Sequence, residues 1–200
     1  MMLSIAERAP IYGWLSGFLV REIDEACWIG LGREPIRGLL SRAEPGFHAW
    51  SASPFTEEID AALAEEYARL FLLPEGVSPF VSTWLDGDRE QLSGSLASMV
   101  ERGLVVLARE PVRREPWGRL PLDHLACVFD VVSESIASGE PMQVEVAIHL
   151  DTELLGPWLV SFGERVRTLA ETPFYRAIGS IITELHCRAA EGAGLRTWRA

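Results

Sequence analysis

The chain has 200 residues, of which 48% are hydrophobic and 24% are charged, and its formal net charge is −11 at neutral pH. This apolar fraction is too high for a disordered chain, and the length is enough for one domain with a sizeable core. The acidic balance argues against a general nucleic-acid binder, because phosphate contacts need clustered Lys and Arg; solubility alone is a sufficient cause of the charge.

Two helices are predicted in the first quarter of the chain. Apolar residues recur at steps of three and four from Leu3 to Glu25, and Pro10 either kinks this helix or marks its true start. A shorter amphipathic helix is predicted from Pro35 to Ala43.

The middle of the chain predicts two more helices on either side of a Pro-rich turn. Ser53-Pro54 or Thr56 begins the first of them, and acidic residues follow, where they favour the positive end of the helix dipole. Its apolar pattern continues to Phe71, and Pro and Gly residues between positions 74 and 79 end it. Residues 73–80 form a linker, and residues 91–101 are predicted as the next helix.

The second half of the chain predicts three further helices. Residues 109–120 hold Pro, Gly and several charges, and are predicted as a hinge-like loop. A helix then follows Pro121 and ends at Gly139, another begins at Gly156-Pro157, and the last begins at Thr172-Pro173. The last helix is expected to reach about Ala190, with a frayed tail from about residue 191.

Two segments have strand character. Residues 103–107 form a short apolar run, and Gln143 to Leu150 alternates between apolar and polar residues. Isolated strands are rarely stable, and every long segment has helical spacing. The predicted fold class is therefore all-α, a single-domain bundle of about seven to ten helices over residues 1–200.

The sequence predicts a cytoplasmic location without stable membrane insertion. The longest uncharged apolar stretch near the start, Pro10 to Val20, is about half of the ~20 residues that a membrane span needs. No basic region precedes an apolar one at the start, so no secretory signal is predicted. Three widely spaced cysteines (Cys27, Cys127 and Cys187) are typical of a reducing compartment.

No catalytic, metal or cofactor site is predicted. His124 with Cys127 and His186 with Cys187 include potential zinc ligands, but their spacing departs from the usual C-x₂₋₄-C and H-x₃₋₅-H patterns. A buried cysteine beside a surface histidine is the favoured interpretation. Motifs for a serine nucleophile and for a phosphate-binding loop are missing from the sequence.

Two local features remain as candidate binding sites. Asp123-His124 follows Pro121 at the opening of a helix, where a carboxylate is stabilised and holds a neighbouring His; the alternative is a capping Asp with an incidental His. Four aromatic residues surround the Pro-rich turn, and they either pack across the bundle or line an apolar groove for a peptide. These residues are Tyr67, Phe71, Phe80 and Trp84.

Three sequence blocks occur in an order and spacing that match a known family. The first is EYARLF at 66–71, continued by PFVSTW at 79–84; the second is PLDHLA at 121–126, and the third is TPFY at 172–175. Together they resemble the TorD/DmsD family of maturation chaperones for molybdenum enzymes, which includes NarJ-like members. Val128 stands where the family often has an acidic residue.

The resemblance implies an all-helical protein that is not an enzyme and needs no cofactor. Members of the family bind the twin-arginine signal peptide of a molybdopterin oxidoreductase, and hold its catalytic subunit in the cytoplasm until the molybdenum cofactor is inserted. The family includes domain-swapped dimers, so a homodimer is compatible with the resemblance. Some members are reported to bind guanine nucleotide weakly, although no phosphate motif supports that here.

An apolar groove rimmed by carboxylates suits such a peptide, since arginine pairs with carboxylates and stacks on aromatic rings. Asp123 would pair with a cation, and His124 would shape the pocket. The predicted signal-peptide-binding residues are Tyr67, Leu70, Phe71, Pro79, Phe80, Ser82, Trp84, Pro121, Asp123 and His124. The alternatives are a small helical metal-dependent hydrolase and a helical interaction module whose aromatic residues all lie in the core.

Overall fold

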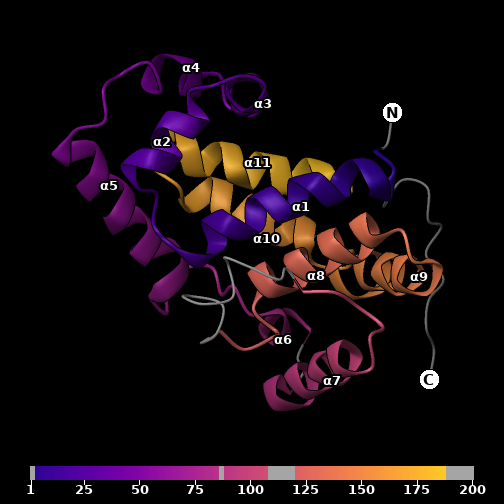
Figure 1. The fold of residues 1–200 in the computed structure, drawn as a ribbon. Helices are drawn as coiled ribbons and strands as arrows, with labels where there is room; N and C mark the ends of the chain where they lie inside the picture. Colours follow the sequence, from indigo (N-terminus) through magenta and orange to yellow (C-terminus); the bar gives the residue numbers. More distant parts are fainter. Residues whose placement is uncertain (1–2, 86–87, 108–119, 188–200) are drawn as a thin grey trace.

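The computed structural model describes residues 3–85, 88–107 and 120–187, which form an all-helical bundle (Figure 1). The helices are α1 (Ile5–Val20), α2 (Glu25–Leu31), α3 (Ile36–Ala43), α4 (Gly46–Trp50), α5 (Glu57–Tyr67), α6 (Val81–Trp84), α7 (Arg89–Glu101), α8 (Leu125–Ser138), α9 (Pro141–His149), α10 (Leu159–Leu169) and α11 (Pro173–Cys187). The π-helical segments η1 (Ala68–Leu72) and η3 (Leu150–Leu155) continue α5 and α9. The predicted all-α fold class is confirmed.

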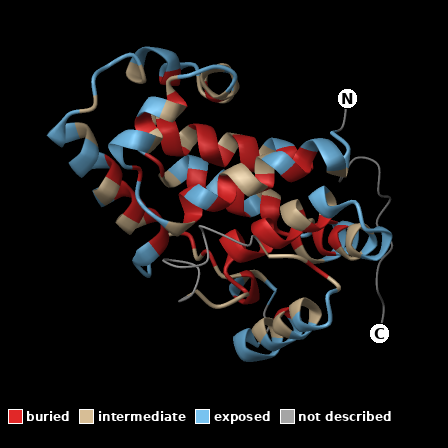
Figure 2. Ribbon diagram, viewed as in Figure 1, coloured by how far each residue is buried: buried red, intermediate tan, exposed pale blue. Residues whose placement is uncertain are grey.

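Two closely packed helix pairs make the centre of the core. In the pair α1–α8, the ring of Tyr12 stacks on Phe129 with the centroids 4.8 Å apart. In the pair α10–α11, a Cβ atom on Gly163 would lie 2.7 Å from the carbonyl oxygen of Gly179, so only glycine allows this close approach. Figure 2 shows buried residues along the inward faces of α1, α8 and α11.

The first predicted helix is wrong in its length. The hydroxyl of Ser4 accepts a hydrogen bond from the Glu7 amide and starts α1, so Pro10 lies inside the helix instead of starting it. The backbone is extended at Arg21, after α1 ends. The carboxylate of Asp24 accepts a hydrogen bond from the backbone amide of Cys27 at 2.8 Å. This N-cap begins a separate helix, α2.

Neither segment with strand character forms a strand. Residues 103–107 have no regular structure, and most of the alternating segment belongs to α9. Gly139, with a φ of +68°, ends α8 and reverses the chain, so that α9 packs back on α8. Ala147 is buried in α9, while the large apolar residues Met142 and Ile148 are exposed, and apolar residues at exposed positions obscure the helical pattern in the sequence.

Several predicted boundaries agree with the structure. Thr56 caps α5, and Pro173 is the first residue of α11. The predicted hinge-like loop lies outside the described residues apart from its last position, and so does the tail from residue 191. None of the helices in the described ranges is both long enough and apolar enough to cross a membrane.

Candidate functional site

The first and third sequence blocks meet where α5 contacts the start of α11. The carboxylate of Glu66 is only 3% exposed and accepts hydrogen bonds from the backbone amides of Glu171 and Thr172, the latter at 3.0 Å. Arg69 donates through Nη1 to the carbonyl of Leu169 at 2.9 Å. These contacts hold the α10–α11 connection against α5 and η1. Glu66 and Arg69 of the EYARLF block therefore have a structural role.

The predicted binding residues of this block lie mainly in the core. Leu70 is fully buried, and Tyr67 and Phe71 are almost so. The Phe71 ring contacts the rings of Tyr67 and Tyr175 edge-on, with centroids 5.5 and 5.9 Å apart. Tyr67 borders an open hollow with three acidic lining residues, which is described below, and Leu70 lines a smaller one.

The PFVSTW and PLDHLA blocks meet in a short antiparallel bridge between Phe80 and His124. The amide of Val81 donates to the carbonyl of Asp123 at 2.9 Å, and the amide of Leu125 donates to the carbonyl of Pro79 at 2.7 Å. Two chain segments far apart in the sequence are thereby fixed side by side. Five of the ten predicted site residues come together here: Pro79, Phe80, Ser82, Asp123 and His124.

Asp123 is fully buried and its carboxylate is held from both sides. Ser82 donates to Oδ2 at 2.7 Å, and Ser93 of α7 donates to Oδ1 at 3.1 Å. The Nε atom of Arg89 lies 3.7 Å from Oδ2 and supplies the positive charge. The interpretation of Asp123 as a helix cap is wrong, because His124 occupies the N-cap position of α8.

His124 is a buried, neutral cap residue. Its Nδ1 atom accepts a hydrogen bond from the Ala126 amide at 3.2 Å, which assigns the ring proton to Nε2. Burial lowers the pKa of His124 to about 4, although the nearby Asp123 acts in the opposite direction. The His124 ring also meets the Phe80 ring at 88°, with the centroids 5.3 Å apart, so it supports the edge of that aromatic ring.

Trp84 attaches the turn that contains Phe80 to the rest of the helical bundle. Its indole nitrogen donates to the carbonyl of Ser78 at 2.9 Å, and its ring stacks on Trp158 of the α10 region with the centroids 5.5 Å apart. Trp84 and Phe80 are both half-buried, and so is Pro121, whose carbonyl accepts the amide of His124 at 2.9 Å. The turn is thus rigidly attached while one part of its aromatic surface reaches solvent.

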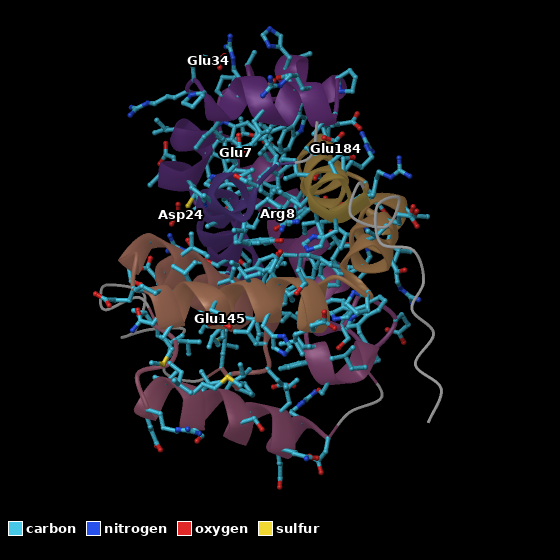
Figure 3. The ribbon with its side chains drawn as sticks, turned by 90° about the vertical axis from the view of Figure 1, so that its right-hand side faces the viewer. Glu7, Arg8, Asp24, Glu34, Glu145 and Glu184 are labelled. Carbon is cyan, nitrogen blue, oxygen red and sulfur yellow. The ribbon has the colours of Figure 1, made fainter. Side chains whose placement is uncertain are left out.

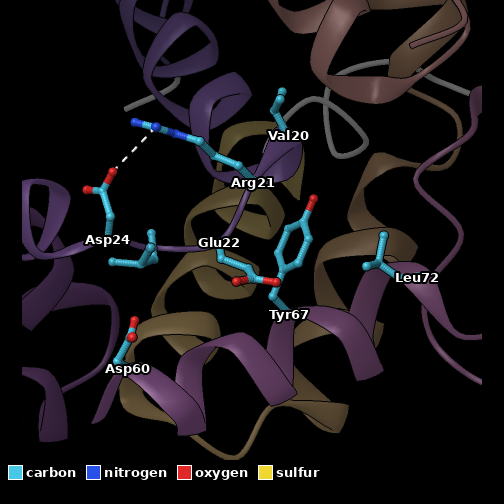
Figure 4. A pocket seen from close by; sticks show the side chains of 8 residues that line it. Val20, Arg21, Glu22, Asp24, Asp60, Tyr67 and Leu72 are labelled. Carbon is cyan, nitrogen blue, oxygen red and sulfur yellow. Dashed lines mark ion pairs between the residues drawn. The ribbon is translucent and has the colours of Figure 1, made fainter. Parts of the chain in front are cut away.

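A hollow of about 460 Å³ opens beside Tyr67, between the end of α1 and the α5–η1 segment (Figure 4). The Tyr67 hydroxyl donates to the carbonyl of Leu19 at 3.2 Å, and burial together with the charge of Glu22 raises its pKa to about 12. Arg21 pairs with Asp24 at 3.4 Å. The lining residues are Val20, Arg21, Glu22, Ile23, Asp24, Asp60, Tyr67 and Leu72.

Sequence reasoning missed the acidic lining of this hollow. Glu22 and Asp24 lie in the connection between α1 and α2, whereas Asp60 lies in the first turn of α5, where it has the local pattern of a helix-dipole charge. The sequence holds no local signal that would have joined them.

A second buried polar cluster joins α1, η3 and α11. Arg8 makes an ion pair with Asp151, and the Tyr12 hydroxyl donates to the same carboxylate at 2.6 Å. The Nε2 atom of His186 lies 3.3 Å from Asp151. Burial raises the pKa of Asp151, but the hydrogen bonds from His186 and Tyr12 and the charge of Arg8 together hold it below its usual value. Figure 3 places Arg8 between α1 and α11.

This cluster was also missed, and its only sequence signal is weak. Arg8 lies four residues before Tyr12, and therefore on the face of α1 that the apolar residues bury. A charged residue on that face indicates a buried partner without identifying it.

The two histidines considered as zinc ligands lie in different parts of the structure. His124 and His186 belong to the two different clusters, and burial raises the pKa of the Cys127 thiol to about 12. The side chain of Cys187 is outside the described part of the chain. Within that part, no group of three or more His, Cys, Asp or Glu residues is arranged to hold a metal ion.

No protein-family model matches this chain, and no curated protein matches it either. The resemblance to the maturation chaperones therefore depends on the sequence blocks alone.

Proposed function

We propose that this protein is a cytoplasmic chaperone that binds the twin-arginine signal peptide of a molybdopterin oxidoreductase and assists cofactor insertion into that enzyme's catalytic subunit. The sequence blocks suggest the family. The observation that carries the proposal is the acidic, aromatic hollow beside Tyr67, because its chemistry matches an arginine-bearing peptide.

The charge of the hollow favours a guanidinium group. Three carboxylates line it against one arginine, and that arginine already pairs with Asp24. Among the described residues, neither Glu22 nor Asp60 makes an ion pair, so a cation entering the hollow meets two carboxylates without a partner. The Tyr67 ring, which is only 6% exposed, closes the inner wall of the hollow with Glu22 beside it in Figure 4, so the carboxylates would supply the main contacts to a guanidinium.

The rim of the hollow offers an apolar surface as well. Leu72, which lines the hollow, is 63% exposed, and Leu73 is 53% exposed at the entrance to a smaller hollow of about 190 Å³. Large aliphatic side chains that lie exposed next to each other are typical of recognition surfaces. An apolar segment that follows the arginines of a signal peptide would cover these two leucines.

Calorimetric titration with a synthetic peptide that has two adjacent arginines before an apolar stretch tests the proposal. The double variant Glu22→Gln/Asp60→Asn should weaken binding by about tenfold, since it removes two charges from the hollow. The matched control, Glu101→Gln/Glu145→Gln, removes two exposed carboxylates on α7 and α9 and should leave the affinity unchanged. Equal weakening in both double variants would reduce the effect to net charge and contradict the proposed site.

A second peptide separates guanidinium recognition from simple charge attraction. Replacing both arginines with lysines keeps the charge but removes the planar group that pairs with carboxylates through two parallel hydrogen bonds. The lysine peptide should bind more weakly at the same ionic strength. Equal affinity for the two peptides would contradict specific recognition of the twin-arginine motif.

A helical interaction module without signal-peptide specificity is the second candidate. The burial of Tyr67, Leu70 and Phe71 favours it, because these aromatic and aliphatic residues serve the core. Such a module would bind neither peptide, or would bind both alike.

A further inference from the structure

The arginine that pairs with Asp123 also lies on an aromatic face. The Cζ atom of Arg89 is 3.8 Å from the centroid of the Phe80 ring, and its Nε atom is 3.7 Å from Asp123 Oδ2. A guanidinium that contacts an aromatic face and a carboxylate at these distances has a geometry typical of arginine recognition.

Phe80 and Asp123, which contact the Arg89 guanidinium, are held in place by residues other than Arg89. Asp123 is fixed by the hydroxyls of Ser82 and Ser93, and the edge of the Phe80 ring is supported by His124. The backbone bridge between Phe80 and His124 fixes the spacing of the two segments. Phe80 and Asp123 would therefore keep their positions if the guanidinium moved away.

Arg89 itself is held loosely. Its side chain is 51% exposed, and no hydrogen bond from it is found among the described residues. The helix that carries it is anchored one turn later by Ser93, which bonds both the carboxylate and the amide of Asp123, and two turns later by the buried Leu96. The Arg89 side chain can therefore leave the site while α7 stays in place.

We propose that Phe80 and Asp123 form a guanidinium-binding site that Arg89 occupies in cis, and that an arginine of a bound peptide takes its place. The peptide in question is the client of the function proposed above, on which this part of the proposal rests. Arg89 competes with the incoming arginine, so it lowers the affinity of the free protein and raises its selectivity. A lysine side chain displaces Arg89 poorly, because it lacks the planar group that covers the ring.

The test uses the whole chain and arginine amide as the probe, followed by NMR through the ring signals of His124, which contacts Phe80. In Arg89→Gln the site is vacated, and half-maximal shifts should need about fivefold less arginine amide than in the wild type. Lysine amide should leave the His124 signals unshifted. Arg102→Gln, which removes an exposed arginine at the other end of α7, should behave as the wild type.

Further variants keep the result decisive. Phe80→Leu in the Arg89→Gln background should abolish the response to arginine amide while the helicity of the protein is retained. Arg89→Lys, which keeps the charge at this position, should respond at intermediate concentrations. Absence of a response in Arg89→Gln, or an equal response to both amides, would overturn the proposal.

The outcome is separate from the test of the proposed function. Arginine amide on Arg89→Gln reports only on the Phe80–Asp123 site, whereas the peptide titration of Glu22→Gln/Asp60→Asn reports on the hollow at Tyr67. Either can fail while the other succeeds.

Discussion

Asp151 and Asp123 are buried carboxylates that each pair with an arginine, but only the arginine beside Asp151 is enclosed. The side chain of Arg8, beside Asp151, is 11% exposed, whereas that of Arg89, beside Asp123, is 51% exposed. Arg8 is packed between helices, while Arg89 projects from the first position of α7. The comparison teaches that burial of the carboxylate is not enough to make an ion pair permanent; the exposure of the cation determines whether it can be exchanged.

The largest expected effect separates the two carboxylates directly. Asp151→Asn leaves the Arg8 charge buried without its partner, and should lower the free energy of unfolding by about 3–5 kcal/mol. Asp123→Asn should cost only about 1–2 kcal/mol, because Arg89 can turn into solvent and the amide oxygen still accepts from a serine. Urea denaturation at neutral pH measures both, and equal losses would break the comparison.

The pH dependence of stability differs between the two clusters. The pKa of His124 is lowered from 6.5 to about 4, so the unfolded chain binds its proton more readily between these values. This contribution is complete above pH 6.5 and is lost as the pH falls toward 4, by about 2 kcal/mol at pH 5. The pKa of Asp151 is lowered from 3.8, so its contribution is complete above that pH and is lost only in stronger acid.

His124→Asn isolates the first effect, because asparagine still caps a helix but does not titrate. The loss of stability from pH 7.5 to pH 5 should be about 2 kcal/mol smaller in the variant than in the wild type. Parallel pH profiles for the two proteins would show that His124 is not the titrating group.

Removing one hydroxyl from the enclosed cluster should have a smaller effect. Tyr12→Phe deletes the hydrogen bond to Asp151 and should lower the free energy of unfolding by about 1.5 kcal/mol. Tyr175 provides a matched control, since its hydroxyl is buried without a hydrogen-bond partner in the described structure. Tyr175→Phe should be neutral or stabilising, and a loss equal to that of Tyr12→Phe would contradict the role given to the bond.

The smallest stability change is expected at the exposed arginine. Arg89→Gln should change the free energy of unfolding by less than about 1 kcal/mol, because the side chain is half in solvent. Thermal unfolding beside the binding experiments would measure it. A loss of stability as large as that of Asp151→Asn would mean that the fold needs Arg89 in this position, and that another arginine cannot displace it.

The parts of the fold that were predictable depend on local interactions. Thr56 and Gly139 set helix ends through contacts within a few residues, and the sequence shows both signals. The sequence left residues 143–150 open between helix and strand for the opposite reason. The pattern there depends on which side of α9 the rest of the bundle covers, and a sequence window does not contain that information.

The candidate site also has features that the sequence showed and features that only the structure shows. The sequence showed that Asp123, His124 and Phe80 were unusual for their surroundings, but not that a bridge joins them or that Arg89 covers the ring. It assigned Tyr67, Leu70 and Phe71 to one apolar wall, whereas the structure places them in the core, with Tyr67 and Leu70 at the edges of two different hollows. Aromatic residues in a helix have the same pattern whether they face a core or a groove.

The sequence by itself determined that the chain is helical, since apolar spacing and helix caps act over three or four residues. Only the tertiary structure decided which charges are enclosed and which are exchangeable. Arg8 and Asp151 are 143 residues apart in the chain, and Ser82 and Asp123 are 41 apart. The electrostatic character of each pair depends on how much water the packed helices exclude, and that quantity exists only once distant segments have come together.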